Sequence, residues 1–152
     1  QSGKQVLSES HILLKNRNSL LLFPKLAKTN EEVYWITKDQ SEVKVPLKMS
    51  FCNVSDISNQ SSNVIFVDED MLQFPLTLRR WQEGDVFQPS GMTGKKKLSK
   101  FFKDEKFSLL DKANAWLLCS ENQIIWIVGQ RADERFKATA NTTKILKINY
   151  EA

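Results

Sequence analysis

The chain has little of what most catalytic and metal centres require. Its 152 residues include one histidine, His11, and two cysteines, Cys52 and Cys119. A Ser/His/Asp or Cys/His centre would depend on that single histidine, and nothing around it in the sequence indicates an activated pair. Zinc sites take several Cys or His ligands, so no zinc site is expected. The sequence therefore predicts no catalytic residue and no metal ligand on this chain.

Long apolar runs and a disulfide framework are also missing. Apolar runs such as residues 124–128 have strand length, far below the roughly 20 residues that span a bilayer. The first apolar stretch is short and bounded by basic residues, so no secretory signal is expected. Both cysteines lie in apolar, strand-like runs. We therefore expect two reduced, buried thiols in a cytoplasmic protein.

The apolar content is instead that of one folded domain. Hydrophobic residues make up 41% of the chain, with four Trp and nine Phe, which argues against disorder. Residues 12–14 and 20–23 predict a hairpin, and residues 33–36 and 64–67 predict further strands. Every second residue from 43 to 51 is apolar, which indicates a half-buried strand. Pro46 places that strand at a sheet edge or breaks it.

The second half of the chain mixes strands with short helices. Residues 116–119 and 124–128 predict a hairpin, and residues 144–150 predict a last strand. Apolar residues at helical spacing predict a helix over 96–105, and residues 109–114 predict one more helical turn. The predicted fold class is α+β, a strand-rich layered domain with one or two short helices, formed by residues 1–152.

Positive charge is concentrated in one segment, residues 79–106. This segment holds eight Lys or Arg and four Asp or Glu, and eight minus four equals the net charge of +4 of the whole chain. A concentrated field of one sign favours a polyanionic partner, because Lys and Arg that neutralise phosphates release condensed counterions. A solvated, solubilising face explains the charge alone equally well.

Other motifs also bear on whether the basic segment binds a polyanionic partner or only keeps the protein solvated. Gly91 and Gly94 precede three lysines, but only two residues separate them and no hydroxyl follows Lys95, so an ATP-binding loop is rejected. A second basic cluster consists of Arg131, Arg135, Lys137, Lys144 and Lys147, and pairing of Arg131 with Asp133 or Glu134 is the internal alternative. Three aromatic residues are candidates for base stacking, although a place in the core is their more common role: Trp81, Phe87 and Trp126.

The order of residues in the second half resembles a known family. It runs LRRWQEGD at 78–85, then Phe87, Pro89, Gly91-Met92 and GKKKLSKFF at 94–102; IWIVG follows at 125–129, then Arg131, DERF at 133–136 and a Thr142 to Lys144 end. Together these are similar to the C-terminal domain of the tRNA(Ile)-lysidine synthetase family. The resemblance covers residues 76–147, and residues 1–75 are interpreted as a strand-rich lead-in.

The resemblance implies a fold shared with a module of the phenylalanyl-tRNA synthetase β subunit. It also implies a ligase that uses ATP to join lysine to the wobble cytidine of tRNA(Ile). The N-terminal catalytic domain, which would bind ATP with Mg²⁺ and lysine, is expected to be absent from this chain, so the fragment is expected to be inactive. Its implied role is to hold tRNA(Ile), with the acceptor stem as the expected contact.

The candidate RNA-binding residues follow from the charge and the motif together. They are seven basic residues of the 79–106 segment and the two arginines of the second cluster: Arg79, Arg80, Lys95, Lys96, Lys97, Lys100, Lys103, Arg131 and Arg135. Asp85 is expected to pin the loop rather than to contact RNA. The alternative is a protein-interaction or dimerisation module with a basic face, and a homodimer of the complete protein stays open. A free-standing enzyme is disfavoured by the single histidine.

Overall fold

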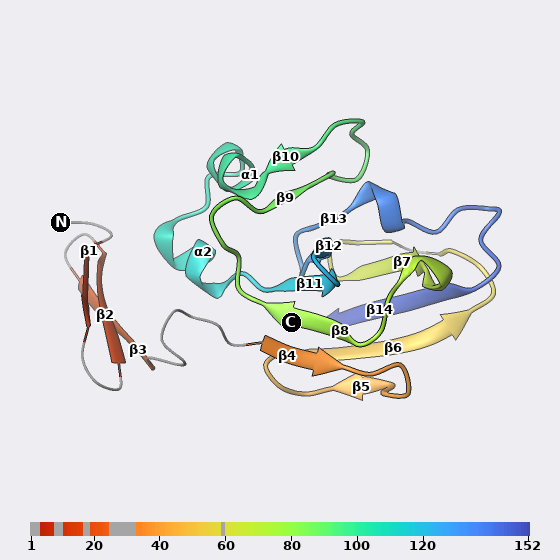
Figure 1. Ribbon diagram of the computed structural model, residues 1–152, viewed down its shortest axis with the longest axis horizontal. Helices are drawn as coiled ribbons and strands as arrows, with labels where there is room; N and C mark the ends of the chain where they lie inside the picture. The colour runs from red at the N-terminus through yellow and green to blue at the C-terminus, as the bar shows by residue number, and fades with distance from the viewer. Residues whose placement is uncertain (1–3, 8–10, 17–18, 25–32, 59) are drawn as a thin grey trace.

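The structure is a computed structural model that describes residues 4–7, 11–16, 19–24, 33–58 and 60–152. Its first element is a three-stranded antiparallel sheet, in the order β1 (Lys4–Leu7), β2 (His11–Asn16) and β3 (Ser19–Pro24) (Figure 1). β2 and β3 pair from His11 opposite Pro24 to Asn16 opposite Ser19. This register confirms that the two apolar runs near the start of the chain pair with each other. The side chain of His11 lies outside the described residues.

Two further sheets form the body of the fold. The five-stranded sheet has the order β13 (Arg131–Ala132), β12 (Gln123–Ile127), β11 (Leu117–Ser120), β8 (Leu76–Arg79) and β4 (Val33–Ile36). The four-stranded sheet has the order β5 (Glu42–Val43), β6 (Lys48–Val54), β14 (Ile145–Glu151) and β7 (Val64–Asp68). Residues 33–68 thus contribute strands to both sheets, and β14 lies at the centre of the second one.

The strand predicted over residues 43–51 is two strands. β5 turns back onto β6, so that Val43 pairs with Met49, and the break falls at Pro46. Within β6 the alternation holds, because Met49 and Phe51 are buried. Cys52 falls on the opposite face and is exposed, which corrects the expectation that both thiols are buried.

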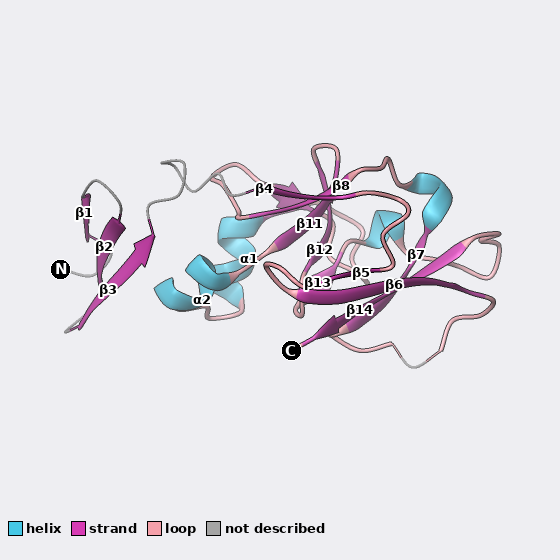
Figure 2. Cartoon of the chain, turned by 90° about the horizontal axis from the view of Figure 1, so that it is seen from below, coloured by secondary structure: helices cyan, strands magenta, loops and turns pink. Residues whose placement is uncertain are grey.

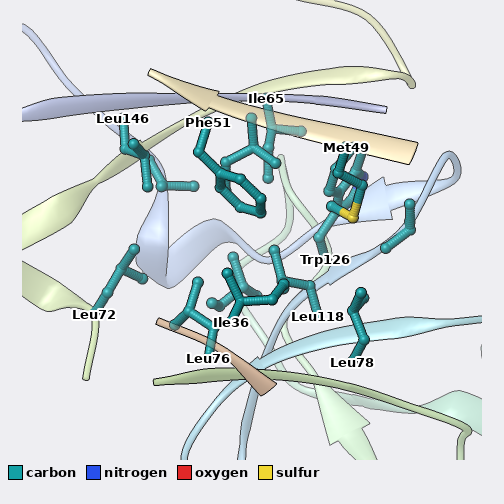
Figure 3. Packing of buried hydrophobic residues seen from close by; sticks show 14 of the residues in the cluster. Ile36, Met49, Phe51, Ile65, Leu72, Leu76, Leu78, Leu118, Trp126 and Leu146 are labelled. Carbon is teal, nitrogen blue, oxygen red and sulfur yellow. The ribbon is translucent and has the colours of Figure 1, made fainter. Parts of the chain in front are cut away.

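The main core lies between these two sheets. Figure 3 shows Met49, Phe51, Ile65 and Leu146 of the four-stranded sheet pointing toward residues of the five-stranded one. The residues they face include Ile36, Leu76, Leu78 and Leu118. These side chains are at most 7% exposed, and burying each one fully stabilises the fold by about 1.5–3 kcal/mol.

The other face of the five-stranded sheet is covered by a helical layer. Two short helices, α1 (Leu98–Asp104) and α2 (Leu109–Asn114), follow a ribbon of β9 (Val86–Phe87) and β10 (Lys96–Lys97) (Figures 1 and 2). Single 3-10 turns, η1 (Glu69–Met71) and η2 (Glu134–Phe136), complete the described elements. The layered α+β prediction is therefore confirmed. No helix among the described residues is long and apolar enough to span a membrane.

Local sequence explains where the two helices begin. α2 starts at a capping box, in which Ser108 and Asp111 each accept a hydrogen bond from the other's backbone N–H. α1 starts at Leu98 and not at Lys96 as the spacing predicted, because Lys96 and Lys97 pair with Phe87 and Val86 as a strand. The backbone N–H of Leu98 then donates to the carbonyl of Asp85, 2.9 Å away.

Candidate nucleic-acid interface

The lysines of the basic segment are carried by a small, well-packed unit. Leu98, Phe101 and Phe102 of α1 are at most 4% exposed and pack with Phe87 of β9 against β11 and β12. Because these apolar residues occupy one side of α1, Lys100 and Lys103 are left on the outside, and both are exposed. Burial of the aromatic residues therefore fixes the backbone that carries the lysines.

Lys95, Lys96, Lys97 and Lys100 line an open hollow together with Met92 and Gly94. The Nζ atom of Lys96 lies 2.6 Å from a carboxylate oxygen of Asp104, and that of Lys100 lies 3.6 Å from the same oxygen. The hydrogen bond from Lys96, with the charges of both lysines, lowers the pKa of Asp104 below its ordinary value. Among the described residues, Lys95, Lys97 and Lys103 have no ion-pair partner.

Arg79 is held inside the protein at the root of the ribbon. Its guanidinium donates two hydrogen bonds of 3.0 Å to Asp85 and one of 2.9 Å to the carbonyl of Arg80. Asp85 also accepts the N–H of Gln82 at 2.7 Å. Burial acts to lower the pKa of Arg79, but the hydrogen bond to Asp85, with the interactions of Cys119 and the charge of Asp85, outweighs it and raises the value. Asp85 therefore pins the loop, as the sequence predicted.

Arg80 packs on Trp116 at the edge of the core. Its guanidinium carbon is 3.7 Å from the centre of the Trp116 ring, a cation–π contact, and Nη1 donates to the carbonyl of Ala115 at 3.4 Å. Trp116 in turn meets Tyr34 edge to face at 5.7 Å. These contacts fix the direction of the Arg80 side chain.

The second basic cluster braces the loop between β9 and β10. Asp133 is 1% exposed and accepts the backbone N–H of Arg135 at 2.7 Å and of Gln88 at 2.9 Å. The Arg135 side chain adds bonds of 3.0 and 2.8 Å to the same carboxylate, which raise the pKa of Arg135. Arg131 donates to the carbonyl of Ser90 at 3.3 Å. The pairing of Arg131 with Asp133 or Glu134 that the sequence favoured is therefore wrong: Asp133 pairs with Arg135, and Arg131 has a backbone partner instead.

The aromatic candidates belong to the core. Phe87 and Trp126 are fully buried, and Trp81 packs edge to face on Phe102 at 5.1 Å. The core reading of these residues is confirmed. The described residues contain no group of three or more His, Cys, Asp or Glu that could hold a metal ion.

Sequence reasoning missed one set of contacts. The Glu134 carboxylate accepts the N–H of Gly91 at 2.8 Å, and the Glu134 N–H donates to the carbonyl of Gln88 at 2.7 Å. These partners are 43 and more residues apart in the sequence. No local pattern reports such a contact, so only the fold shows that the DERF motif is a brace for the glycine loop.

Comparison with known proteins places these residues in a family. The model of the TilS substrate C-terminal domain matches residues 76–150. The tRNA(Ile)-lysidine synthases of Parabacteroides distasonis and Bacteroides thetaiotaomicron are 38% and 34% identical over 99% and 96% of the chain. The chain spans about a third of the length of these curated relatives, 35% and 32%.

A solved structure supports the same assignment at the level of the fold. The crystal structure of a TilS C-terminal domain superimposes with a TM-score of 0.66, at 20% identity, over 80% of this chain and 98% of that one. The family model, the relatives and the shared fold agree with the resemblance carried by residues 76–147. Residues 76–150 of the chain therefore belong to the family of TilS C-terminal domains.

Proposed function

We propose that this chain is the tRNA-holding domain of an ATP-dependent ligase that joins lysine to the wobble cytidine of AUA-reading tRNA(Ile). The product nucleoside, lysidine, would switch the tRNA from methionine to isoleucine identity. ATP with Mg²⁺, and lysine, would bind to a catalytic domain outside this chain, in a cytoplasmic enzyme. The contact we assign to this domain is the tRNA acceptor stem.

The proposal rests on a set of exposed lysines that are carried by a tightly packed ribbon and helix. Lys95, Lys97, Lys100 and Lys103 are exposed, and the ribbon and helix beneath them are packed on buried aromatic residues. Double-stranded RNA is held chiefly through phosphates and 2′-hydroxyls, which calls for a basic surface of fixed shape and no catalytic group. The hollow beside Gly94 is lined by four lysines, which makes it a basic site of a size to receive a backbone phosphate.

The fold itself gives no reason for three consecutive lysines at 95–97. Lys96 is neutralised by Asp104, whereas the described residues place no carboxylate within ion-pair distance of Lys95 or Lys97. Lys97 also occupies the N-cap of α1, where a cation opposes the helix dipole and where it makes no side-chain cap. A bound phosphate would relieve this local repulsion.

The proposal is tested by tRNA binding as a function of salt. Lys95, Lys97 and Lys103 are replaced together by Ala in the 152-residue chain, and Lys96 is kept because Asp104 would otherwise be without its nearer partner. Fluorescence anisotropy with tRNA(Ile) gives the affinity over a series of salt concentrations. The affinity should fall, and the slope of log K against log salt should decrease by about 0.7–0.9 for each phosphate that the variant no longer neutralises.

The matched control removes the same charge elsewhere. Lys38, Lys44 and Lys48 are exposed and lie outside the ribbon, α1 and the second basic cluster, and their triple Ala variant should keep most of the slope. The β9–β10 ribbon and α1, with the lysines that they carry, are called the basic ribbon below. If the two triple variants bind tRNA equally well, the basic ribbon is not the RNA-binding surface. Circular dichroism confirms that each variant is folded.

One observation favours the alternative of a protein-interaction module. β4 forms the edge of the five-stranded sheet and exposes Val33 and Trp35, at 40% and 63%. Competition between tRNA and heparin separates the two functions. Preference for tRNA at moderate salt supports RNA binding, whereas equal binding of both polyanions supports a basic face that docks an acidic protein.

A further inference from the structure

Glu134 holds the loop that carries Gly91. Glu134 lies in η2, and its Oε1 atom accepts the backbone N–H of Gly91 at 2.8 Å. Two backbone hydrogen bonds join the same stretch of chain to the loop. The Glu134 N–H donates to the carbonyl of Gln88 at 2.7 Å, and the Ser90 N–H donates to the carbonyl of Ala132 at 2.9 Å. The Glu134 bond is the last of this series along the loop, just before the segment that reaches the lysines.

The backbone on either side of Glu134 is held by Asp133. Asp133 is buried and accepts four hydrogen bonds, two of them from the Arg135 side chain. Gly91, whose N–H donates to Glu134, has a backbone φ of +85°, a conformation that other residues rarely adopt. The contact thus joins the Glu134 side chain to a loop that is hydrogen-bonded to the same stretch of chain at residues 88 and 90.

The loop beyond Gly91 forms one wall of the lysine hollow. Met92 and Gly94 line the hollow together with the lysines of β10 and α1. Met92 is tied back by its N–H to the carbonyl of Pro89, and its own carbonyl accepts the side-chain amide of Gln88, both at 3.0 Å. The position of this wall therefore depends on the hydrogen bonds at residues 88–92.

We propose that Glu134 is a positioning residue for RNA binding: its hydrogen bond to Gly91 sets the wall of the hollow in which the lysines meet a phosphate. This inference rests on the proposed function of the basic ribbon. Glu134 touches no RNA in this role. It acts through the loop.

Substitution of Glu134 changes tRNA affinity in opposite directions if the residue positions the loop and if it acts through its charge alone. A carboxylate near a phosphate site repels the RNA, so removing its charge strengthens binding if the field alone matters. If Glu134 positions the loop, removing the acceptor weakens binding although the protein becomes more positive. Charge and hydrogen bonding therefore predict opposite outcomes for the same residue.

Three substitutions separate charge from hydrogen bonding. Glu134→Gln removes the charge and keeps an Oε1 acceptor, Glu134→Ala removes both, and Glu134→Asp keeps the charge on a side chain one methylene shorter. We expect Glu134→Ala and Glu134→Asp to weaken binding of tRNA(Ile) by about fivefold, the equivalent of one hydrogen bond. Glu134→Gln should bind at least as tightly as the wild type.

The salt dependence and a matched control complete the test. Because every lysine that neutralises a phosphate is kept, the slope of log K against log salt should stay unchanged in all three variants. Glu151→Ala removes one exposed carboxylate from the end of β14 and should not weaken binding. Thermal unfolding reports whether each variant is folded.

Equal affinities of Glu134→Ala and Glu134→Gln would overturn the inference. If Glu134→Ala does not fold, Glu134→Asp decides: wild-type affinity in that variant would also overturn it. A failure of the proposed function looks different, because then the lysine triple variant itself keeps wild-type tRNA binding. If the lysine triple variant binds tRNA more weakly but the Glu134 variants bind it as tightly as the wild type, only the positioning role is rejected.

Discussion

Arg79 and Asp85 form a two-pronged ion pair at the root of the basic ribbon. Both hydrogen bonds measure 3.0 Å, and the two side chains are only 18% and 14% exposed. The pair joins the end of β8 to the loop before β9, so the position of the lysine-bearing unit depends on it. A bidentate, largely buried pair of this kind contributes geometry as well as energy.

We expect Asp85→Ala to lower the free energy of unfolding by about 2–3 kcal/mol, because it leaves a largely buried guanidinium without its partner. Urea denaturation of Asp85→Ala, Arg79→Met and the double variant forms a double-mutant cycle. The coupling energy should exceed about 1 kcal/mol. A coupling energy near zero would show that the pair does not hold the ribbon.

The two thiols are expected to differ sharply in reactivity. Cys52 is exposed, whereas Cys119 is fully buried, and burial raises the pKa of the Cys119 thiol to about 11 despite the nearby charge of Arg79. Since the thiolate is the reactive form, one equivalent of a thiol reagent should react rapidly at about pH 8 and the second only after unfolding. Cys52→Ser should abolish the rapid phase. Rapid reaction of both thiols in the native protein would contradict the buried position of Cys119.

Periodicity and composition predicted the elements of the fold better than their ends. The hairpin of β11 and β12 and the helix over residues 109–114 appear where the sequence placed them. The strand over residues 43–51 divides at Pro46, because one residue without an N–H lets the chain turn back within an otherwise regular alternation. Cys52 could have been placed correctly, since it has the polar parity of that same alternation.

The sequence predicted the positive charge of the site, but not which basic residues face outward and which bond to the protein itself. Lys95 and Lys97 face outward, whereas Arg79, Arg131 and Arg135 donate to groups of the protein itself. Side-chain type alone gives no sign of this division. It depends on which carboxylates and carbonyls the fold brings within reach, and Asp133 is brought beside Gln88 by pairing of distant segments.

The pKa of Asp104 offers a readout of the lysine surface itself. The hydrogen bond from Lys96 lowers the pKa of Asp104 below its ordinary value of 3.8. A lowered carboxyl pKa means that the ionised form stabilises the folded state above the unfolded-state value, and that this contribution disappears as the pH falls through the lower folded-state value. An NMR titration should therefore place the midpoint for Asp104 below 3.8 in the wild type.

Lys96→Ala should move that midpoint upward, because Lys100 alone remains near the carboxylate, at 3.6 Å. Glu105→Gln, which changes a neighbouring exposed carboxylate, is the control and should leave the midpoint low. An Asp104 midpoint that does not respond to Lys96→Ala would mean that the 2.6 Å contact is not formed in solution.

Arg131 tests whether the arginines of the motif contact RNA as well as the protein. Its bond to the carbonyl of Ser90 makes it part of the loop brace, so Arg131→Ala should weaken tRNA binding modestly and leave the salt slope unchanged. Lys97→Ala removes the same charge from the outward surface and should lower the slope by about 0.7–0.9. Both variants are measured side by side with tRNA(Ile) by anisotropy. A lowered slope for Arg131→Ala would show that its guanidinium reaches a phosphate, as the sequence predicted, and would extend the RNA surface beyond the lysines of β10 and α1.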